Sequence, residues 1–383
     1  WRTSSQAYGA FWKAVPLEPK VVAPELETSQ EAEAARRHAR LERLLAAHGL
    51  AERPVAGDGN CQFRALADQL YGSEEHHDAI RAQVLEQLRT LPSRYQGFVP
   101  GLKVSKLGFG CMGITAYYGA SMEDEPAIEL LKAVYDMGYR HFDSAEAYKS
   151  ETKHNEEQLA LFFKTVPRDS YTVATKFMPF MHEGEACDLE SLTQAVDASL
   201  ARLGLDYVDL YYCHRPPSTL EKAEQWMASM KEIVKSGKVR HVGLSEFSPD
   251  WVRKLHAIHP VAAIQIEWSL VTRNLVEEFL LDCCKELGIG VVAYSPLARN
   301  LLAAAPVEVP TDWRAAQPRY SEENLKQNQE LLKKIEAMAE AKSVTAAQLS
   351  LAWLYFKAEQ LGLSMIAIPG TTKIANAKTN LAG

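Results

Sequence analysis

The stretch YTVATKFMPFMHEGEACDLESLTQAVDASLARLGLDYVDLYYCHR, residues 171–215, decides the fold. It begins and ends with short apolar runs, 171–177 and 208–214, whose length and composition are typical of buried strands. Between the runs, apolar residues recur every three or four positions, as in a helix that buries one face: Leu189, Leu192, Val196, Leu200 and Leu203. The stretch therefore predicts a strand, a helix and a second strand parallel to the first.

The same alternation of apolar run and amphipathic segment continues along the chain from about Gly101. Eight apolar runs lie at 107–113, 139–145, 171–177, 208–214, 241–247, 262–268, 290–297 and 364–370. Helix start signals agree with this division, because Ser248 precedes Pro249, and Thr345 and Gln348 have the spacing of a capping box. Eight such units predict an α/β fold of the (β/α)8 TIM-barrel type, with an open doubly wound sheet as the alternative.

The first hundred residues have a different pattern. Residues 1–53 combine prolines with a densely charged helical segment, and residues 54–100 are rich in turn signals and helical patterns. We therefore expect three parts: a linker with a charged helix at 1–53, an incomplete domain at 54–100 and the barrel at 101–383. The N-terminal extension is expected to be mostly helical or partly disordered.

Composition excludes several classes of function. The chain has 383 residues and a formal charge of -7, with acidic and basic residues mixed, so we expect no nucleic-acid partner. No apolar run reaches the roughly 20 residues that a membrane span needs. The six cysteines form no CxxC pair, so we expect no metal site and reduced thiols in the cytoplasm. The sequence starts at Trp1 rather than Met, so we expect further residues before it; it predicts no particular oligomer.

Polar residues stand where successive strands end, which is the end of a (β/α)8 barrel that carries chemistry. Asp143 ends the second run and Tyr148 follows it, while Lys176 and His214 end the third and fourth. Adding hydride to a carbonyl creates an alkoxide that needs a proton, and a neutral tyrosine can supply one at pH 7. A lysine would lower the tyrosine pKa, an aspartate would hold the lysine, and a histidine would orient the carbonyl. Each residue alone has an ordinary structural explanation, so the prediction rests on all four together.

The chain from Gly101 to Gly383 resembles the aldo-keto reductases. The resemblance lies in GLKVSKLGFGCMG, FDSAEAY, ATKF, VDLYYCHR, GKVRHVGLSEFS, IQIEWSL, VVAYSPLARNLL and IPGTTK, which occur in the family's order. It implies an oxidoreductase that uses NADPH to reduce a small aldehyde or ketone to an alcohol. Tyr148 would be the general acid, Lys176 and Asp143 the pair that tunes it, and His214 the residue that orients the carbonyl.

The resemblance also implies cofactor contacts. Tyr294 would stack on the nicotinamide, while Ser245 and Gln265 would hold its carboxamide. The segment IPGTTKIANAKTN would clamp the adenine nucleotide, with Gly370, Thr371 and Lys373 near the 2′-phosphate and Asn380 at the adenine. Further contacts would come from Gly110, Cys111, Met112, Ser295, Pro296, Leu297, Arg299 and Asn376.

Two departures from the family pattern concern the cofactor. The family usually has an arginine where Asn376 stands, so Lys373 and Lys378 would supply the charge that favours NADPH over NADH. In the loop after the seventh strand, Ala298 and Asn300 replace the usual glycines, which we expect to stiffen that turn.

The segment GDGNCQFRALADQLYG resembles the start of an OTU-type (ovarian-tumour) cysteine protease, with Cys61 as nucleophile and Asp58 beside it. The resemblance ends near YQGFVP, before the block that carries that family's catalytic histidine, so we expect no protease activity. Two alternatives to the reductase are a non-catalytic, cofactor-binding redox-sensing subunit, as in the potassium-channel beta subunits of this fold, and a ubiquitin cysteine hydrolase acting through Cys61.

Overall fold

The computed structural model describes residues 73–79, 97–99, 101–274, 276–303, 310 and 312–382. The chain divides into two compact units, Trp1–Pro92 and Ser93–Gly383. In the first unit the described residues contain the short 3-10 helix η1 (Glu74–His76). The predicted charged helix and the segment with Asp58 and Cys61 lie outside the described residues.

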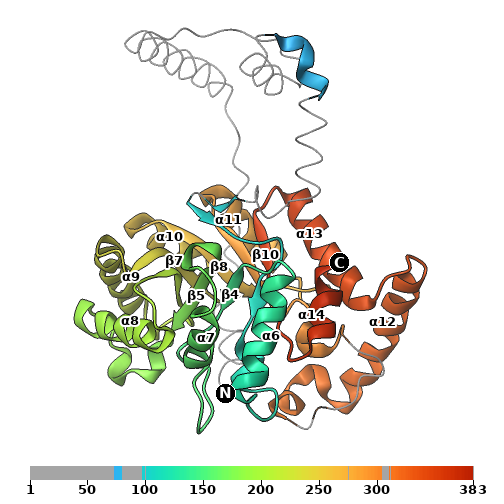
Figure 1. Cartoon of the computed structure of the whole chain (residues 1–383), viewed down its shortest axis with the longest axis horizontal. Coiled ribbons are helices and arrows are strands. Elements are labelled where there is room, and N and C mark those ends of the chain that lie inside the picture. Colours follow the sequence, from blue (N-terminus) through green and yellow to red (C-terminus); the bar gives the residue numbers. More distant parts are fainter. Residues whose placement is uncertain are drawn as a thin grey trace. The chain divides into compact units, whose positions relative to one another are not determined.

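The second unit is built around eight parallel strands, and helices cover the outside of the strands (Figure 1). Each strand pairs with the next one along the chain, and each contains part of one predicted apolar run. The strands are β3 (Phe109–Gly110), β4 (His141–Asp143), β5 (Thr172–Phe177), β6 (Val208–Cys213), β7 (Val239–Ser245), β8 (Val261–Glu267), β9 (Gly290–Tyr294) and β10 (Met365–Ala367). A separate antiparallel hairpin joins β1 (Gly97–Val99) to β2 (Leu102–Lys103).

The first and last strands of the sheet meet. Leu107, just before β3, forms a parallel bridge with Ala367 of β10. The Gly108 N–H donates to the Ala367 carbonyl at 2.9 Å, and the Gly110 N–H donates to the Pro369 carbonyl at 3.3 Å. The sheet thus curls until its two ends join, which confirms the predicted (β/α)8 barrel and excludes the open doubly wound sheet.

The helices follow the strands in the predicted alternation. They are α5 (Met112–Thr115), α6 (Asp124–Asp136), α7 (Asn155–Phe163), α8 (Leu189–Leu203), α9 (Leu220–Lys235), α10 (Pro249–Ile258), α11 (Leu281–Leu287), α12 (Glu322–Glu340), α13 (Ala346–Leu361) and α14 (Ile374–Leu381). Shorter elements are the 3-10 helices η3 (Arg168–Ser170), η4 (Pro179–Met181), η5 (Glu183–Glu185), η7 (Ala298–Asn300), η8 (Trp313–Ala316) and η9 (Pro318–Tyr320), and the π-helical turn η6 (Val276–Leu280). In the described part of the chain, no helix combines the length and apolarity that crossing a membrane would require.

Helix α8 shows how local sequence sets an element. The Asp188 carboxylate accepts a hydrogen bond from the Ser191 N–H at 3.0 Å, which caps the first turn. The helix ends at Gly204, whose φ of 65° is the left-handed conformation that glycine adopts without strain. Four of the five predicted stripe residues are buried, but Leu189, in the first turn, is 46% exposed. The predicted caps of α10 by Ser248 and of α13 by Thr345 are confirmed.

Two glycines form the seam where the barrel closes. A Cβ atom added to Gly370 would lie 2.5 Å from the Gly110 carbonyl oxygen, and one added to Gly110 would lie 2.7 Å from the Ile368 carbonyl oxygen. These distances leave no room for a side chain, since real Cβ atoms do not approach backbone oxygens so closely. Both glycines were predicted to contact the cofactor; the structure gives each a packing role at the seam.

Replacing Gly370 with alanine is expected to lower the free energy of unfolding by about 1–3 kcal/mol, because the new methyl group would push the two backbone segments apart. Urea unfolding followed by tryptophan fluorescence measures the change. Gly113→Ala is the matched control, because its Cβ would come no closer than 3.7 Å to Tyr118. Equal stability of the two variants would contradict a tight seam.

Candidate active site

A buried ion pair joins the ends of β4 and β5. The side chains of Lys176 and Asp143 are 0% and 3% exposed, and the ammonium contacts Oδ1 of the carboxylate directly. Lys176 also donates to the Ser144 carbonyl at 2.5 Å, and Gln265 of β8 donates to the other carboxylate oxygen at 2.8 Å. The Cys111 N–H donates to the Asp143 carbonyl at 2.9 Å, which links the start of α5 to β4. Both buried charges are therefore paired and hydrogen-bonded, as burial of charge requires.

Tyr148 lies in the loop after β4, with its hydroxyl 3.3 Å from the Lys176 ammonium. Its N–H donates to the Ala145 carbonyl at 3.0 Å, and its carbonyl accepts from the Asn155 N–H at 2.9 Å. The Ser144 hydroxyl in turn donates to the Asn155 side chain at 2.6 Å. The start of α7 therefore fixes the backbone of this loop, and only 8% of Tyr148 is exposed.

His214 follows β6 and completes the group. Its N–H donates to the Phe177 carbonyl at 2.8 Å, which places it beside the end of β5. The imidazole and the Tyr148 ring lie edge to face, with centroids 5.7 Å apart at 82°. Its buried Nδ1 has no hydrogen-bond partner in the described part of the chain. The structure thus brings all four candidate catalytic residues together at the carboxyl ends of three adjacent strands.

Burial dominates the electrostatics of these groups. It raises the pKa of Tyr148 above its ordinary value; Lys176 lowers this pKa, as the sequence predicted, but by less than burial raises it. Burial lowers the pKa of Lys176, but Asp143 and Tyr148 more than reverse this and raise it above its ordinary value. Burial, followed by the charges of Lys176 and Arg215, holds the pKa of His214 well below 6.5. At pH 7 the site therefore combines a neutral phenol, a cationic ammonium and a neutral imidazole.

This combination suits donation of a proton to an oxygen that gains negative charge. A phenol with a raised pKa stays protonated at neutral pH, and an adjacent ammonium stabilises the phenolate that remains after donation. A neutral imidazole can donate a hydrogen bond to the same oxygen without contributing a competing charge.

An aromatic group beside Tyr148 was not singled out from the sequence. Tyr117 lies edge to face with Tyr148, with ring centroids 6.4 Å apart, and Trp313 of η8 contacts Tyr117 at the same centroid distance. Met112 and Met178 pack against the buried cluster that Tyr148 forms with Ala145 and Ala147. The signal available in the sequence was the aromatic pair TAYYG just after the first strand, but the partner of Tyr117 comes from a distant loop.

The predicted nicotinamide contacts occupy the ends of three neighbouring strands. Ser245 ends β7 and is 1% exposed, Gln265 lies in β8, and Tyr294 ends β9. The Tyr294 hydroxyl donates to Oε1 of Glu246 at 2.8 Å. Glu246, which the sequence analysis missed, has the left-handed φ of 65° directly after β7. Its carboxylate therefore orients the tyrosine that was predicted to stack on the cofactor.

The loop after β9 bends through several left-handed residues. Ser295, Ala298, Arg299 and Asn300 have φ values of 47°, 52°, 60° and 88°. Alanine and asparagine thus hold conformations that glycine adopts more easily, at two positions where the family resemblance implied glycine. The Arg299 guanidinium pairs with Glu267 at 2.7 Å, while Pro296 is buried and Leu297 partly buried.

The segment after β10 contains the Thr371 hydroxyl and the first turn of helix α14. The Thr371 hydroxyl accepts from the Lys373 N–H at 3.1 Å and from the Asn376 amide at 3.4 Å. Helix α14 begins after Lys373 without a side-chain cap, and both Lys373 and Asn376 are exposed. Asn380, near the end of α14, is 6% exposed. An uncapped helix start beside a lysine and a threonine suits an anion such as phosphate.

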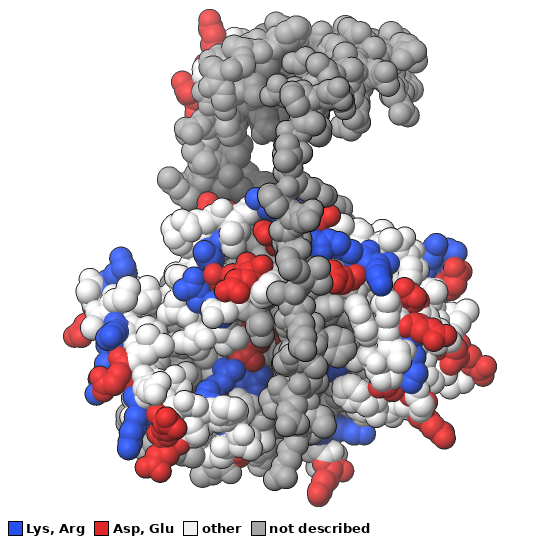
Figure 2. Space-filling view, turned by 180° about the vertical axis from the view of Figure 1, so that it is seen from behind, with Lys and Arg blue, Asp and Glu red and all other residues white. Residues whose placement is uncertain are grey.

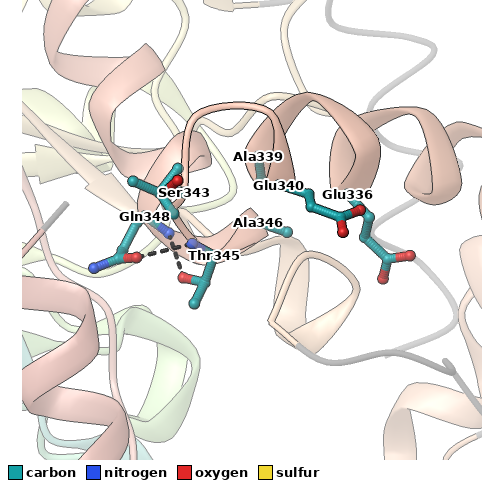
Figure 3. Close-up of a pocket in the computed structure, with 8 residues that line it drawn as sticks. Glu336, Ala339, Glu340, Ser343, Thr345, Ala346 and Gln348 are labelled. Atoms are coloured by element: carbon teal, nitrogen blue, oxygen red, sulfur yellow. Dashed lines mark hydrogen bonds between the residues drawn. The ribbon is translucent and has the colours of Figure 1, made fainter.

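A cavity of about 580 Å³ lies away from these residues, where α12 meets α13 (Figure 3). Glu336 and Glu340 come from α12, while Thr345 and Gln348 close the start of α13 by reciprocal hydrogen bonds of 2.8 and 3.2 Å. These bonds form a capping box, so the polar atoms of Thr345 and Gln348 already stabilise the helix. The described residues contain no group of three or more His, Cys, Asp or Glu side chains that could hold a metal ion.

Comparisons with known proteins agree with this geometry. A sequence model of the aldo/keto reductase family matches residues 106–382. A curated protein of Glycine max, a probable aldo-keto reductase 1, is 40% identical over 291 residues, which cover 73% of this chain and 81% of that protein. The solved structure of a thermostable aldo-keto reductase with the inhibitor epalrestat is 28% identical, with a TM-score of 0.59 over 73% of this chain and 90% of that one. An aldo-keto reductase from Klebsiella pneumoniae in complex with NADPH is 23% identical, with a TM-score of 0.57 over 74% of this chain and 87% of that one, and supports the fold.

Proposed function

The chain belongs to the aldo/keto reductase family, and we propose that it reduces aldehydes or ketones to alcohols with NADPH as cofactor. The observation that carries the proposal is the buried contact chain from Asp143 through Lys176 to Tyr148, with His214 beside the phenol. We assign the activity to the barrel, residues 101–383.

In this proposal the dinucleotide, when bound, supplies the hydride that reduces the carbonyl carbon. Tyr148 gives its hydroxyl proton to the carbonyl oxygen, because its raised pKa keeps it protonated at neutral pH. The Lys176 ammonium, 3.3 Å away, stabilises the phenolate that remains, and Asp143 holds the ammonium in place. Neutral His214 donates a hydrogen bond that orients the carbonyl oxygen toward Tyr148.

The residues after β10 fit the phosphate end of such a cofactor. Gly370 is exposed, and Thr371 offers a hydroxyl beside the uncapped start of α14. Lys373 supplies a cation at that start, which favours the 2′-phosphate that distinguishes NADPH from NADH. At the other end of the cofactor, Ser245 and Gln265 would hold the carboxamide and Tyr294 would stack on the ring.

Replacing Lys373 with alanine is expected to raise the Kd for NADPH by about 10-fold or more and to leave the Kd for NADH within about 2-fold, because only NADPH carries the 2′-phosphate. Quenching of protein fluorescence on titration with each cofactor measures both constants. Lys342→Ala, which removes an exposed lysine just beyond α12, is the matched control. An equal loss of affinity for both cofactors would show that Lys373 does not select the phosphate.

The activity itself is tested by mixing the purified protein with NADPH and a panel of small aldehydes and ketones. Consumption of the cofactor, followed at the nicotinamide absorbance band, supports the proposal when it depends on the carbonyl compound. Tight binding of NADPH without turnover across the panel would refute the reductase and favour the non-catalytic redox-sensing subunit.

A further inference from the structure

A second cavity lies at the end of the barrel opposite the candidate active site. Its volume is about 760 Å³, and its wall includes Thr172 at the start of β5 and Asp209 near the start of β6. Lys176 lies at the other end of β5, about 13 Å along the strand at the usual rise per residue. The cavity therefore shares no residue with the proposed reductase site.

Positive charge outweighs negative charge on the wall of this cavity. Four cationic side chains line it, and two carboxylates, Asp169 and Asp209, accompany them. The cations are Lys103, Arg140, Arg168 and Arg240, which come from four separate segments of the chain. On the surface shown in Figure 2, by contrast, Lys and Arg are interspersed with Asp and Glu. The fold thus brings an excess of cationic side chains together in the wall of this cavity.

Two of the arginines share a single carboxylate. The Asp209 side chain is 5% exposed, and it pairs with Arg168 at 2.7 Å through Oδ2 and with Arg240 at 3.5 Å through Oδ1. Both guanidiniums lie over the Tyr207 ring, at 3.9 and 3.6 Å from its centroid. One carboxylate cannot neutralise two guanidiniums, so positive charge remains, and the ring holds both groups in defined positions.

The third arginine adds charge without a carboxylate partner. Arg140 lies over the Tyr135 ring at 3.9 Å and donates to the carbonyls of Tyr135 and Tyr139. These are neutral acceptors, and within the described ranges no carboxylate pairs with Arg140. Its positive charge therefore has no anionic partner among the described residues in the wall of the cavity.

We propose that this cavity binds a small molecule that carries a phosphate group. Guanidinium groups present forked N–H donors that match phosphate oxygens, and fixed arginines lose little entropy on binding. A volume of about 760 Å³ suits a small phosphorylated metabolite. Arg240 is the main contact, because its side chain is 52% exposed and its one ion pair among the described residues, with Asp209, is long at 3.5 Å.

The test is calorimetric titration of the full chain with inorganic pyrophosphate, ribose 5-phosphate and citrate. It is run in Lys373→Ala protein, so that the proposed cofactor clamp does not contribute to binding. Pyrophosphate or ribose 5-phosphate is expected to bind, and Arg240→Gln is expected to weaken that binding about 10-fold. Arg253→Gln, which removes an exposed arginine of α10 paired with Glu286, is the matched control and is expected to change nothing.

Lys103→Gln tests a second cation of the cavity wall, from the hairpin strand β2. This substitution is expected to weaken phosphate binding by several-fold. Absence of binding at millimolar pyrophosphate and ribose 5-phosphate would overturn the proposal. So would equal affinity in the Arg240 and Arg253 variants, or tighter binding of citrate than of both phosphates. Turnover of a carbonyl substrate is expected to survive Arg240→Gln, because this residue lies at the other end of the barrel.

Discussion

Tyr148→Phe is expected to lower kcat for carbonyl reduction by about 10²–10⁴-fold, the usual contribution of a general acid. The phenol is the proposed proton donor, and phenylalanine keeps the ring contacts with His214 and Tyr117 while removing only the hydroxyl. Because the hydroxyl makes one hydrogen bond among the described residues, to Lys176 at 3.3 Å, the fold and the cofactor affinity are expected to change little. Stopped-flow absorbance at the nicotinamide band measures the rate.

The matched control for this substitution is Tyr135→Phe. Tyr135 lies on α6, where its hydroxyl donates to Ser170 at 2.8 Å, so its loss removes a hydrogen bond outside the proposed site. Activity close to wild type is expected for the control. Undiminished turnover in Tyr148→Phe, with folding verified by its thermal transition, would remove Tyr148 from the role of proton donor.

Lys176→Met is expected to reduce both activity and stability. Removing the ammonium leaves the Asp143 carboxylate buried with Gln265 as its remaining side-chain partner, and breaking a buried ion pair in this way costs about 3–5 kcal/mol. The phenolate of Tyr148 also loses the cation that stabilises it, so kcat is expected to fall by about 10²-fold or more. Denaturant unfolding and single-turnover kinetics measure the two effects separately.

A double variant distinguishes the two effects of Lys176. In Lys176→Met with Asp143→Asn, no uncompensated charge remains, so much of the lost stability is expected to return while activity stays low. Recovery of activity together with stability would mean that Lys176 serves only to neutralise Asp143. A single variant as stable as wild type would contradict the buried ion pair itself.

Much of the fold could be predicted because parallel strands are buried on both faces. Such strands appear as short continuous apolar runs, and the run at 208–214 corresponds to β6 with one residue of difference. Strand boundaries were less predictable where a helix follows at once. The run at 107–113 contains only the two residues of β3, because α5 already begins at Met112. The barrel itself was predicted, but not the residues that close it, since closure depends on the fit between Gly110 and Gly370.

The catalytic candidates could be predicted because their positions follow from strand order. Asp143, Lys176 and His214 end consecutive strands, so their convergence needed only the barrel. The aromatic contact of Trp313 with Tyr117 could not be foreseen, because it joins two loops far apart in the sequence. The net rise in the pKa of Tyr148 could not be foreseen for a related reason: burial depends on every group that encloses the ring, and it outweighs the lowering by Lys176 that the sequence predicted.

The bridge between Leu107 and Ala367 has a consequence for the chain during its synthesis. Until β10 leaves the ribosome, β3 and β9 each present an unpaired sheet edge, and such edges can pair with other unfinished chains. Joining segments so distant in sequence costs about 5 kcal/mol of chain entropy, which only the completed set of contacts can offset. Addition of the last strand covers both edges at once, so a nascent chain that stops before β10 carries two aggregation-prone borders.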